Sequence, residues 1–380
     1  MERLIYLDHG ATTRVDERVL NKMIPYYSLN FGNPSSVYFI GRRNKRVIEE
    51  ARQNVASCLG AKQKEIYFTS CGSESDNLAL KGVAYANSSR GKHIITSKIE
   101  HSAILNTCAT LERQGFKVSY LNVDCNGVIN LEELENSITQ DTILISIMFA
   151  NNEIGTIEPI EKISQIAKKH NVYFHTDAVQ AVGNVRINVD ELGIDLLSMS
   201  AHKFYGPKGV GALYVRDGIN FERIQDGGGQ EKGKRSGTEN VAGIVGLCTA
   251  IQYAYKEFDF NNTKVTALRN YFVNNLIKQF NNVKINGDLN NRLPGNINVS
   301  FDGIDGEQLL LKLDEYGICA SSASACSTGS SKPSHVLTAI GLTKEQAAGT
   351  VRFTLGKENT QSDIDYTIRT ILNTTYNNKK

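Results

Sequence analysis

The sequence predicts an α/β protein with a mostly parallel sheet, followed by a second, smaller α+β domain. In the middle of the chain, nearly continuous apolar runs alternate with amphipathic stretches, a pattern typical of sheets covered by helices on both faces. The expected strands are 93–96, 117–123, 142–150, 171–177 and 194–200, and the expected helices between them include 102–115 and 161–170. Ligands of such sheets bind outside the carboxyl ends of the strands, so we expect site residues directly after these runs.

The pattern changes after about Gly246, which indicates a second domain. There the expected helices are 242–258, 263–279, 306–315 and 362–373, and the expected strands are 296–302 and 349–356. We therefore expect a large domain formed by residues 15–255 and a small domain formed by residues 1–14 together with 256–380.

Composition and charge exclude several classes of protein. The 380 residues are 41% hydrophobic and 22% charged, which is ordinary for a globular protein. A net charge of +2 gives no electrostatic basis for binding nucleic acid or an anionic membrane. There is no apolar run long enough to span a membrane and no signal-like start, so we expect a cytoplasmic protein. The seven cysteines contain no C-x-x-C pair, which favours a reducing compartment over a disulfide framework or zinc site.

Two ionisable residues follow consecutive predicted strands. Asp177 ends the run "VYFHTD", and Lys203 follows the next run in "SMSAHKFYGPKGVG". A strand–helix–strand connection would bring both to one edge of the sheet. A buried acid needs a partner such as a protonated heteroaromatic nitrogen, and Gln180 could reach the same ligand as Asp177. A half-desolvated lysine such as Lys203 has a lowered pKa and can form a Schiff base. The alternatives are an acid that caps the next helix and an exposed loop lysine.

The stretch "FTSCGSESDNLALKG" (68–82) places small residues between a strand end and a helical pattern. The free amides of a helix N-terminus, with Gly72 and Ser73, would form a phosphate seat. Ser73-x-x-Asp76 also resembles an ordinary capping box, so the sequence leaves both interpretations open.

His101 follows another strand-like run, in "KIEHSAIL". It could stack on a ring and exchange protons near neutral pH, or it could be purely structural. A metal site built from His175, Asp177 and His202 is a weaker alternative, because no further carboxylate or thiol completes a recognisable ligand set.

Cys326 lies in the Ser- and Gly-rich segment 319–334, whose composition suits a mobile surface loop. An accessible thiolate can act as a nucleophile, and a mobile arm could carry sulfur between sites. An unremarkable loop cysteine is the alternative.

Together these stretches resemble pyridoxal-phosphate (PLP) enzymes of fold type I, most closely the cysteine desulfurases of the NifS/IscS group. The resemblance runs from "YLDHGATT" (6–13) to "VRFTLG" (351–356). Between them lie "FGNPSS" (31–36), "TSCGSESDNLALKG" (69–82), "EHSAIL" (100–105), "NNEIGTI" (151–157), "HTDAVQAVG" (175–183), "SAHKFYGPKGVGALYV" (200–215), "RSGTENV" (235–241), "SSASACSTGS" (321–330) and "PSHVL" (333–337). It implies a large domain with a mostly parallel seven-stranded sheet and a small domain that carries the cysteine loop.

The resemblance also implies roles for individual residues. Lys203 would hold PLP as a Schiff base and move protons at the substrate Cα, and Asp177 would keep the pyridine nitrogen protonated. Around the ring, Gln180 would contact the ring hydroxyl, His101 would stack on the ring, and Asn152 would lie beside ring and substrate. The phosphate would be held by Gly72, Ser73, Ser200 and His202. Thr238 would reach the phosphate of the neighbouring subunit, which implies a homodimer. Arg352 would clamp the substrate carboxylate. Ser73 stands where threonine is more usual in the family, which keeps the hydroxyl.

The implied reaction converts L-cysteine to L-alanine and leaves a persulfide on Cys326. The sulfur would pass to an iron–sulfur scaffold protein or a tRNA-thiolation enzyme, and Cys326 could transiently bind an iron–sulfur cluster. Two other hypotheses remain: another PLP enzyme, such as a selenocysteine lyase or aminotransferase, and a non-enzymatic sulfur or cluster carrier.

Overall fold

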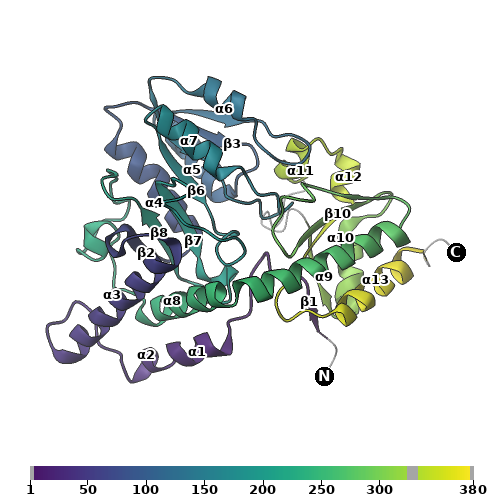
Figure 1. Cartoon of the computed structure of the whole chain (residues 1–380), viewed down its shortest axis with the longest axis horizontal. Helices are drawn as coiled ribbons and strands as arrows, with labels where there is room; N and C mark the ends of the chain where they lie inside the picture. The colour runs from purple at the N-terminus through teal and green to yellow at the C-terminus, as the bar shows by residue number, and fades with distance from the viewer. Residues whose placement is uncertain (1–3, 323–332, 377–380) are drawn as a thin grey trace.

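The computed structural model of the chain describes residues 4–322 and 333–376, and its larger body is built on a seven-stranded sheet (Figure 1). The strand order is β2-β8-β7-β6-β5-β3-β4. The strands are β2 (Ile66–Thr69), β3 (His93–Ser97), β4 (Lys117–Leu121), β5 (Thr142–Ser146), β6 (Tyr173–Asp177), β7 (Leu196–Ser200) and β8 (Gly211–Val215). Within this sheet only β8 runs antiparallel to its neighbours, so the predicted mostly parallel α/β sheet is confirmed.

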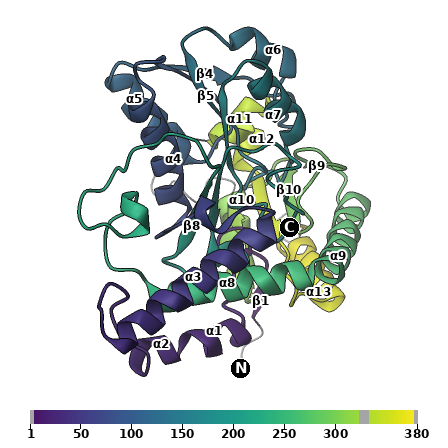
Figure 2. The same cartoon turned by 60° about the vertical axis from the view of Figure 1, so that its left-hand side comes forward.

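Successive strand residues point to opposite faces of this sheet, and each face has its own buried core. Ile145 and Phe174 pack in a core with α1 (Glu17–Met23), α3 (Phe39–Leu59), α7 (Ile160–Lys169) and α8 (Val241–Lys256). Leu144 and Leu196 pack on the other side with α4 (Gly72–Ala86) and α5 (Ser102–Arg113). The result is a three-layer body, and Figure 2 shows α3 and α8 side by side on one of its outer layers.

The connection between β6 and β7 differs from the expected strand–helix–strand unit. Residues 178–195 form turns and a short bridge between Val182 and Val185, with no helix. Gly183 and Gly193 adopt left-handed backbone conformations there, with φ of +84° and +66°, and such residues interrupt a helix. The strands are still parallel neighbours, paired from His175 to Asp177, so their carboxyl ends do meet at one edge.

The smaller body contains a four-stranded sheet of order β12-β13-β10-β9. Its strands are β9 (Val283–Ile285), β10 (Asn296–Phe301), β12 (Ser321–Ser322) and β13 (Thr350–Thr354), and its helices are α9 (Phe258–Gln279), α10 (Gly306–Glu315) and α13 (Gln361–Tyr376). Ile5 and Leu7 belong to its core, and β1 (Ile5–Tyr6) pairs in parallel with β11 (Ile318–Cys319). The N-terminal residues thus pack with the C-terminal part of the chain. The exact division into two domains at residues 15 and 256 stays a prediction.

Two helices join the two bodies. α8 ends at Lys256 and α9 begins at Phe258, so together they run almost end to end along the molecule (Figure 1). The remaining helices are short: α2 (Pro25–Ser28), α6 (Leu131–Ser137), α11 (His335–Ala339), α12 (Lys344–Ala348) and the 3₁₀ turns η1 (Gln63–Glu65), η2 (Ala201–Lys203) and η3 (Glu231–Gly233). In the described part of the chain, no helix has the length and apolar character needed to cross a membrane.

Candidate active site

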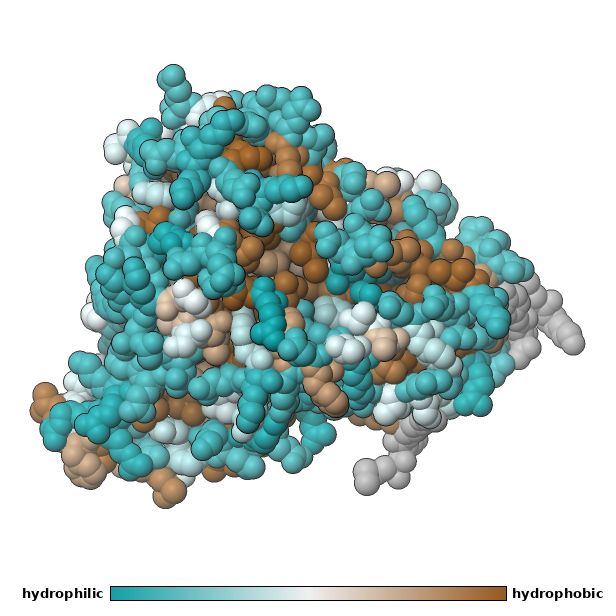
Figure 3. All heavy atoms as spheres, viewed as in Figure 1, coloured by the Kyte–Doolittle hydropathy of each residue, from teal (hydrophilic) through white to brown (hydrophobic). Residues whose placement is uncertain are grey.

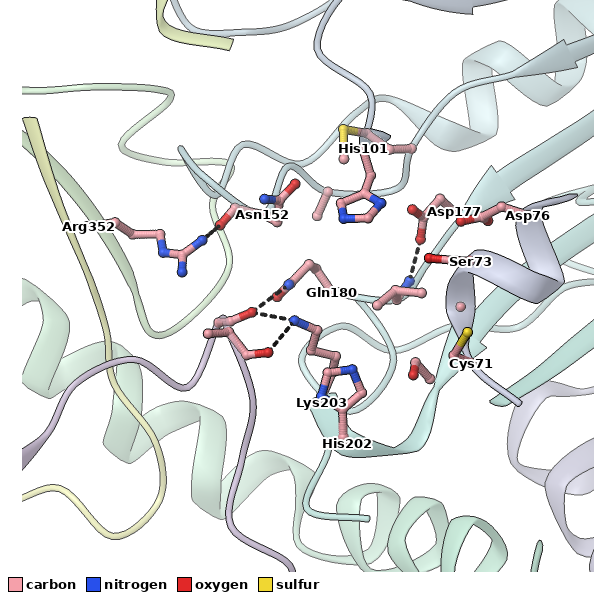
Figure 4. A pocket seen from close by; sticks show the side chains of 17 residues that line it. Cys71, Ser73, Asp76, His101, Asn152, Asp177, Gln180, His202, Lys203 and Arg352 are labelled. Carbon is pink, nitrogen blue, oxygen red and sulfur yellow. Dashed lines mark hydrogen bonds between the residues drawn. The ribbon is translucent and has the colours of Figure 1, made fainter. Parts of the chain in front are cut away.

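A pocket of about 300 Å³ lies at the carboxyl ends of the central strands, next to the smaller body (Figure 4). In the space-filling view, brown, apolar residues gather on the face of the molecule where the two bodies meet (Figure 3). The pocket collects ten of the twelve residues that the sequence singled out: Gly72, Ser73, His101, Asn152, Asp177, Gln180, Ser200, His202, Lys203 and Arg352. Thr238 is exposed and does not line the pocket, and Cys326 lies outside the described residues.

Lys203 ends the 3₁₀ turn that follows β7, and its amine points across the pocket to the N-terminal segment. Its Nζ donates to the carbonyl oxygens of Gly10 at 2.6 Å and Ala11 at 2.8 Å. Gln180 Nε2 donates to the same Gly10 oxygen at 3.0 Å. The turn behind the lysine is tight, because a Cβ on Gly206 would lie 2.8 Å from the Ala201 side chain and carbonyl. Glycine is therefore required there for close approach rather than for phosphate binding.

Asp177 ends β6 and is almost fully buried. Its Oδ1 accepts a hydrogen bond from the backbone N–H of Val179 at 2.9 Å. Burial raises the pKa of Asp177, while the nearby His101 and Lys203 act in the opposite direction. A carboxylate in this position would gain most from a ligand that brings its own N–H⁺ group.

His101 is the N-cap of α5 and faces the pocket. Its Nδ1 accepts a hydrogen bond from the backbone N–H of Ala103 at 3.2 Å. In the neutral ring the proton therefore sits on Nε2, so the backbone fixes which nitrogen can donate. This is the arrangement that a proton-exchanging histidine needs.

The N-terminus of α4 forms one wall of the pocket, and the alternative of a capping box at Ser73 and Asp76 is wrong. The helix begins at Gly72 with Cys71 as its N-cap, and no side chain caps it. The helix thus starts ahead of Ser73, which leaves that side chain exposed at the pocket and turns Asp76 into the buried interior. A Cβ on Gly72 would lie 2.5 Å from Val179 Cγ2, so the backbone approaches this wall closely.

Two further groups would suit a phosphate beside this helix end. The buried hydroxyl of Ser200 has no hydrogen-bond partner among the described residues. Burial, followed by the charges of Lys203 and Lys208, lowers the pKa of His202 to about 4, so its ring is neutral at pH 7. An anion at this place could accept hydrogen bonds from the free amides of the α4 N-terminus, from the Ser200 hydroxyl and from the neutral His202 ring.

Arg352 comes from β13 of the smaller body and is almost fully buried. Its Nη2 donates to Asp8 Oδ1 at 2.9 Å and its Nη1 to the Asn152 carbonyl at 3.0 Å. Its Nε is also buried and has no hydrogen-bond partner in the described chain. The guanidinium is held in place with donor capacity left for a carboxylate ligand.

His175, Asp177 and His202 do not form the metal site that the sequence left as an alternative. Within residues 4–322 and 333–376, no three His, Cys, Asp or Glu side chains are grouped as metal ligands would be. Both ring nitrogens of His175 are engaged, Nδ1 with Ser146 Oγ at 2.9 Å and Nε2 with Ser198 Oγ at 3.0 Å. Cys326, which the sequence suggested as a transient iron–sulfur ligand, lies outside the described residues.

Several pocket residues were not found from the sequence. Gly10 and Ala11 contribute backbone carbonyls, which leave no side-chain signal. Cys71 and Asp76 line the pocket too, and Asp76 was interpreted only as part of a helix cap. Because α4 begins two residues ahead of the start that a Ser73 cap implies, Asp76 falls in its buried part, and no local pattern of the sequence showed this.

The site combines a lysine amine, a buried carboxylate for a ring nitrogen, a histidine and an anion seat. These groups fit a phosphorylated pyridine aldehyde, and with the three-layer sheet they define a PLP enzyme of fold type I. The aminotransferase class-V family model matches residues 5–367. The chain is 52% identical to cysteine desulfurase IscS of Clostridium botulinum, covering 98% of this chain and 94% of the relative. It is 54% identical to that of Dictyoglomus turgidum, covering 97% and 93%.

Solved structures agree with these relatives. A NifS-like protein has a TM-score of 0.91 at 43% identity, with 98% of both chains covered. A structure described as SspA in complex with cysteine has a TM-score of 0.83 at 39% identity, covering 94% of this chain and all of that one. The chain belongs to the class-V aminotransferase family and, within it, to the PLP-dependent cysteine desulfurases of the IscS/NifS group.

Proposed function

We propose that this enzyme converts L-cysteine to L-alanine and captures the sulfur as a persulfide on Cys326. The observation that carries the proposal is the convergence of Lys203, Asp177 and Arg352 on one pocket. Bound PLP supplies an electron sink for charge that develops at the substrate Cα.

The residues divide the work of holding the cofactor and the substrate. Asp177 would hold the ring nitrogen in its protonated form, and Gln180 would reach the ring hydroxyl. The α4 N-terminus at Gly72 and Ser73, with Ser200 and His202, would hold the phosphate. Arg352 would bind the substrate carboxylate, and Asn152 would lie beside ring and substrate.

Lys203 would then move the proton. Its Nζ already donates to two backbone carbonyls, which keep the amine at one end of the pocket when it is not bound to the cofactor. From there it can take a proton from the substrate Cα and return one to the product. His101 Nε2 would serve a second proton transfer, since Nδ1 is engaged by the backbone.

The sulfur step balances without an external oxidant. The Cys326 thiolate attacks the substrate sulfur, an S–S bond forms and the substrate C–S bond breaks. The electron pair stays with the substrate carbon, which is then protonated. One cysteine and one thiol thus give one alanine and one persulfide.

The enzyme would work as a homodimer that passes its sulfur to an acceptor protein. Large apolar side chains are exposed between the end of α1 and the start of α3, including Ile24, Tyr27, Leu29, Phe31, Val37 and Phe39. Clusters of this kind mark protein interfaces. Thr238 is exposed at the surface, which suits its proposed reach to a neighbouring subunit. Binding to nucleic acid is not part of the proposal.

The proposed location is the cytoplasm, and the proposed acceptor is an iron–sulfur scaffold protein or a tRNA-thiolation enzyme. Two relatives are cysteine desulfurases named IscS, which supports a sulfur-transfer role. The six described cysteines are all free thiols, which fits a reducing compartment.

The test is to incubate the protein with L-cysteine and a reductant and to measure alanine and sulfide. Equal amounts of both products, and a persulfide on Cys326 by mass spectrometry, are expected. Cys326→Ser should abolish both, whereas Cys125→Ser, which changes an exposed cysteine, should not. Alanine formation that survives in Cys326→Ser would overturn the proposed nucleophile, and no alanine from PLP-loaded protein would redirect the search to selenocysteine and aminotransferase substrates.

A further inference from the structure

A second carboxyl group lies beneath the proposed cofactor site. Asp76 projects from α4 and is 1% exposed, and it lines the same pocket as Asp177 (Figure 4). Its Oδ1 is buried and has no hydrogen-bond partner within the described residues. The proposed reaction gives this group no role, yet a buried carboxyl is costly unless something compensates it.

The basic side chain beside Asp76 does not compensate it. This side chain is His175, whose Nε2 lies 3.8 Å from Asp76 Oδ1. Burial lowers the pKa of His175 to about 3, and serine hydroxyls hold both of its ring nitrogens, so it is neutral. A neutral imidazole cannot form an ion pair.

Other neighbours make the ionised form of Asp76 still less favourable. Burial raises the pKa of Asp76 well above its usual range, and the carboxylate of Asp177 raises it next. Glu100 and Cys71 act in the same direction, whereas a hydrogen bond with Ser198 opposes them. The balance favours a protonated Asp76.

Asp177 has better support for a negative charge. Its carboxylate accepts the Val179 N–H, and the nearby His101 and Lys203 favour its ionised form. Of the two acids in the pocket, Asp177 is therefore the better carboxylate, and Asp76 is the one that keeps its proton.

We propose that Asp76 is a positioning residue that carries a proton in the working enzyme, so that Asp177 is the single negative charge facing the cofactor ring nitrogen. If Asp76 ionised, its charge would favour protonation of Asp177, and a protonated Asp177 could not hold a proton on the ring nitrogen. The inference rests on the proposed role of Asp177, but the protonation of Asp76 can be tested without the cofactor.

The first test is the pH dependence of unfolding of the cofactor-free protein. An acid whose pKa is raised by folding stabilises the protein at low pH, and this stability is lost as pH rises from the unfolded-state pKa toward the folded-state pKa. Across that window, each pH unit shifts the unfolding equilibrium of the wild type by up to about tenfold through Asp76 alone. Asp76→Asn, which mimics the neutral acid, should remove this part of the slope.

An exposed acid is the matched control. Asp226 has a side chain that is 92% exposed, so Asp226→Asn should keep the wild-type slope. If Asp76→Asn also keeps it, Asp76 is not a protonated acid and the proposal is overturned. Should Asp76→Asn fail to fold, the infrared carbonyl band of protonated carboxyl groups in the wild type gives the answer. Glu100→Gln, Glu153→Gln and Glu158→Gln then assign the bands of the buried glutamic acids whose pKa is raised.

The second test is PLP affinity against pH. The wild type should lose affinity at alkaline pH as Asp76 ionises, and Asp76→Asn should lose less. Equal losses in both proteins would contradict the link between Asp76 and Asp177. If neither protein binds PLP at any pH, the proposed function fails, while the unfolding result for Asp76 still stands.

Discussion

The buried Arg352 of β13 and the half-buried Asp8 of the N-terminal segment form an ion pair, with Nη2 2.9 Å from Oδ1. Asp8 Oδ2 in turn accepts a hydrogen bond from Ser321 Oγ at 2.8 Å. The proposed substrate-binding guanidinium is therefore oriented by a residue that does not itself line the pocket. The N-terminal segment would serve the active site through this pair.

Asp8→Asn should raise the KM for L-cysteine with a smaller effect on kcat. The amide keeps the shape but weakens a charge-assisted hydrogen bond, a loss of about 1.5–3 kcal/mol, or roughly tenfold or more in KM. Steady-state kinetics measure this. Arg352→Lys should have a larger effect, because lysine cannot bind a carboxylate with two parallel hydrogen bonds. An unchanged KM in Asp8→Asn would show that Arg352 needs no orientation from Asp8.

Gly72→Ala should weaken PLP binding, because the new Cβ would lie 2.5 Å from Val179 Cγ2 and would displace the wall of the proposed phosphate seat. We expect a loss of about 1–3 kcal/mol, as for other overpacked sites, or roughly tenfold in affinity. Absorbance titration with PLP measures it. Adding Val179→Ala should restore part of the affinity, and Gly229→Ala, where a Cβ meets open space, is the control.

The pair formed by Arg52 and Glu231 should be a major determinant of stability. Both side chains are 3% exposed, and Arg52 donates to Glu231 at 2.6 and 2.8 Å. Glu231 also accepts the Phe68 N–H at 2.8 Å, which ties the segment before α8 to β2. Glu231→Ala leaves the buried Arg52 with only the half-exposed Glu49 at 3.2 Å as a charged partner, so it should cost about 3 kcal/mol in the free energy of unfolding. Urea denaturation measures this loss, and a loss below about 1 kcal/mol would mean that water reaches the arginine.

Much of the site could be predicted from the sequence because its residues follow strands. Asp177 and Lys203 end up at one edge since β6 and β7 are parallel neighbours, which the apolar runs indicated. The helix expected between those strands was wrong, because Gly183 and Gly193 adopt left-handed conformations that interrupt a helix over so short a span.

Other features depend on tertiary contacts that no local pattern reveals. The antiparallel direction of β8 follows from its pairing with both β2 and β7. The pocket position of Asp76 depends on where α4 begins, and helix ends are the least certain feature of a sequence-based prediction. The backbone carbonyls that hold Lys203 come from residues more than 190 positions away in the chain.

Glu158→Gln should make the protein more stable at alkaline pH. Glu158 is 3% exposed, and its Oε2 accepts the Ile129 N–H at 3.2 Å. Burial, followed by the charge of Asp124, raises the pKa of Glu158 to about 8 from its ordinary value of 4.5. The folded protein therefore binds a proton that the unfolded chain releases, and stability is lost as pH rises from 4.5 toward 8. The loss approaches about 1.4 kcal/mol per pH unit within that window. Glutamine keeps the acceptor and cannot ionise, so the variant should lack this slope in urea denaturation across the window. Parallel pH profiles for the wild type and Glu158→Gln would show that Glu158 is ionised in the folded protein.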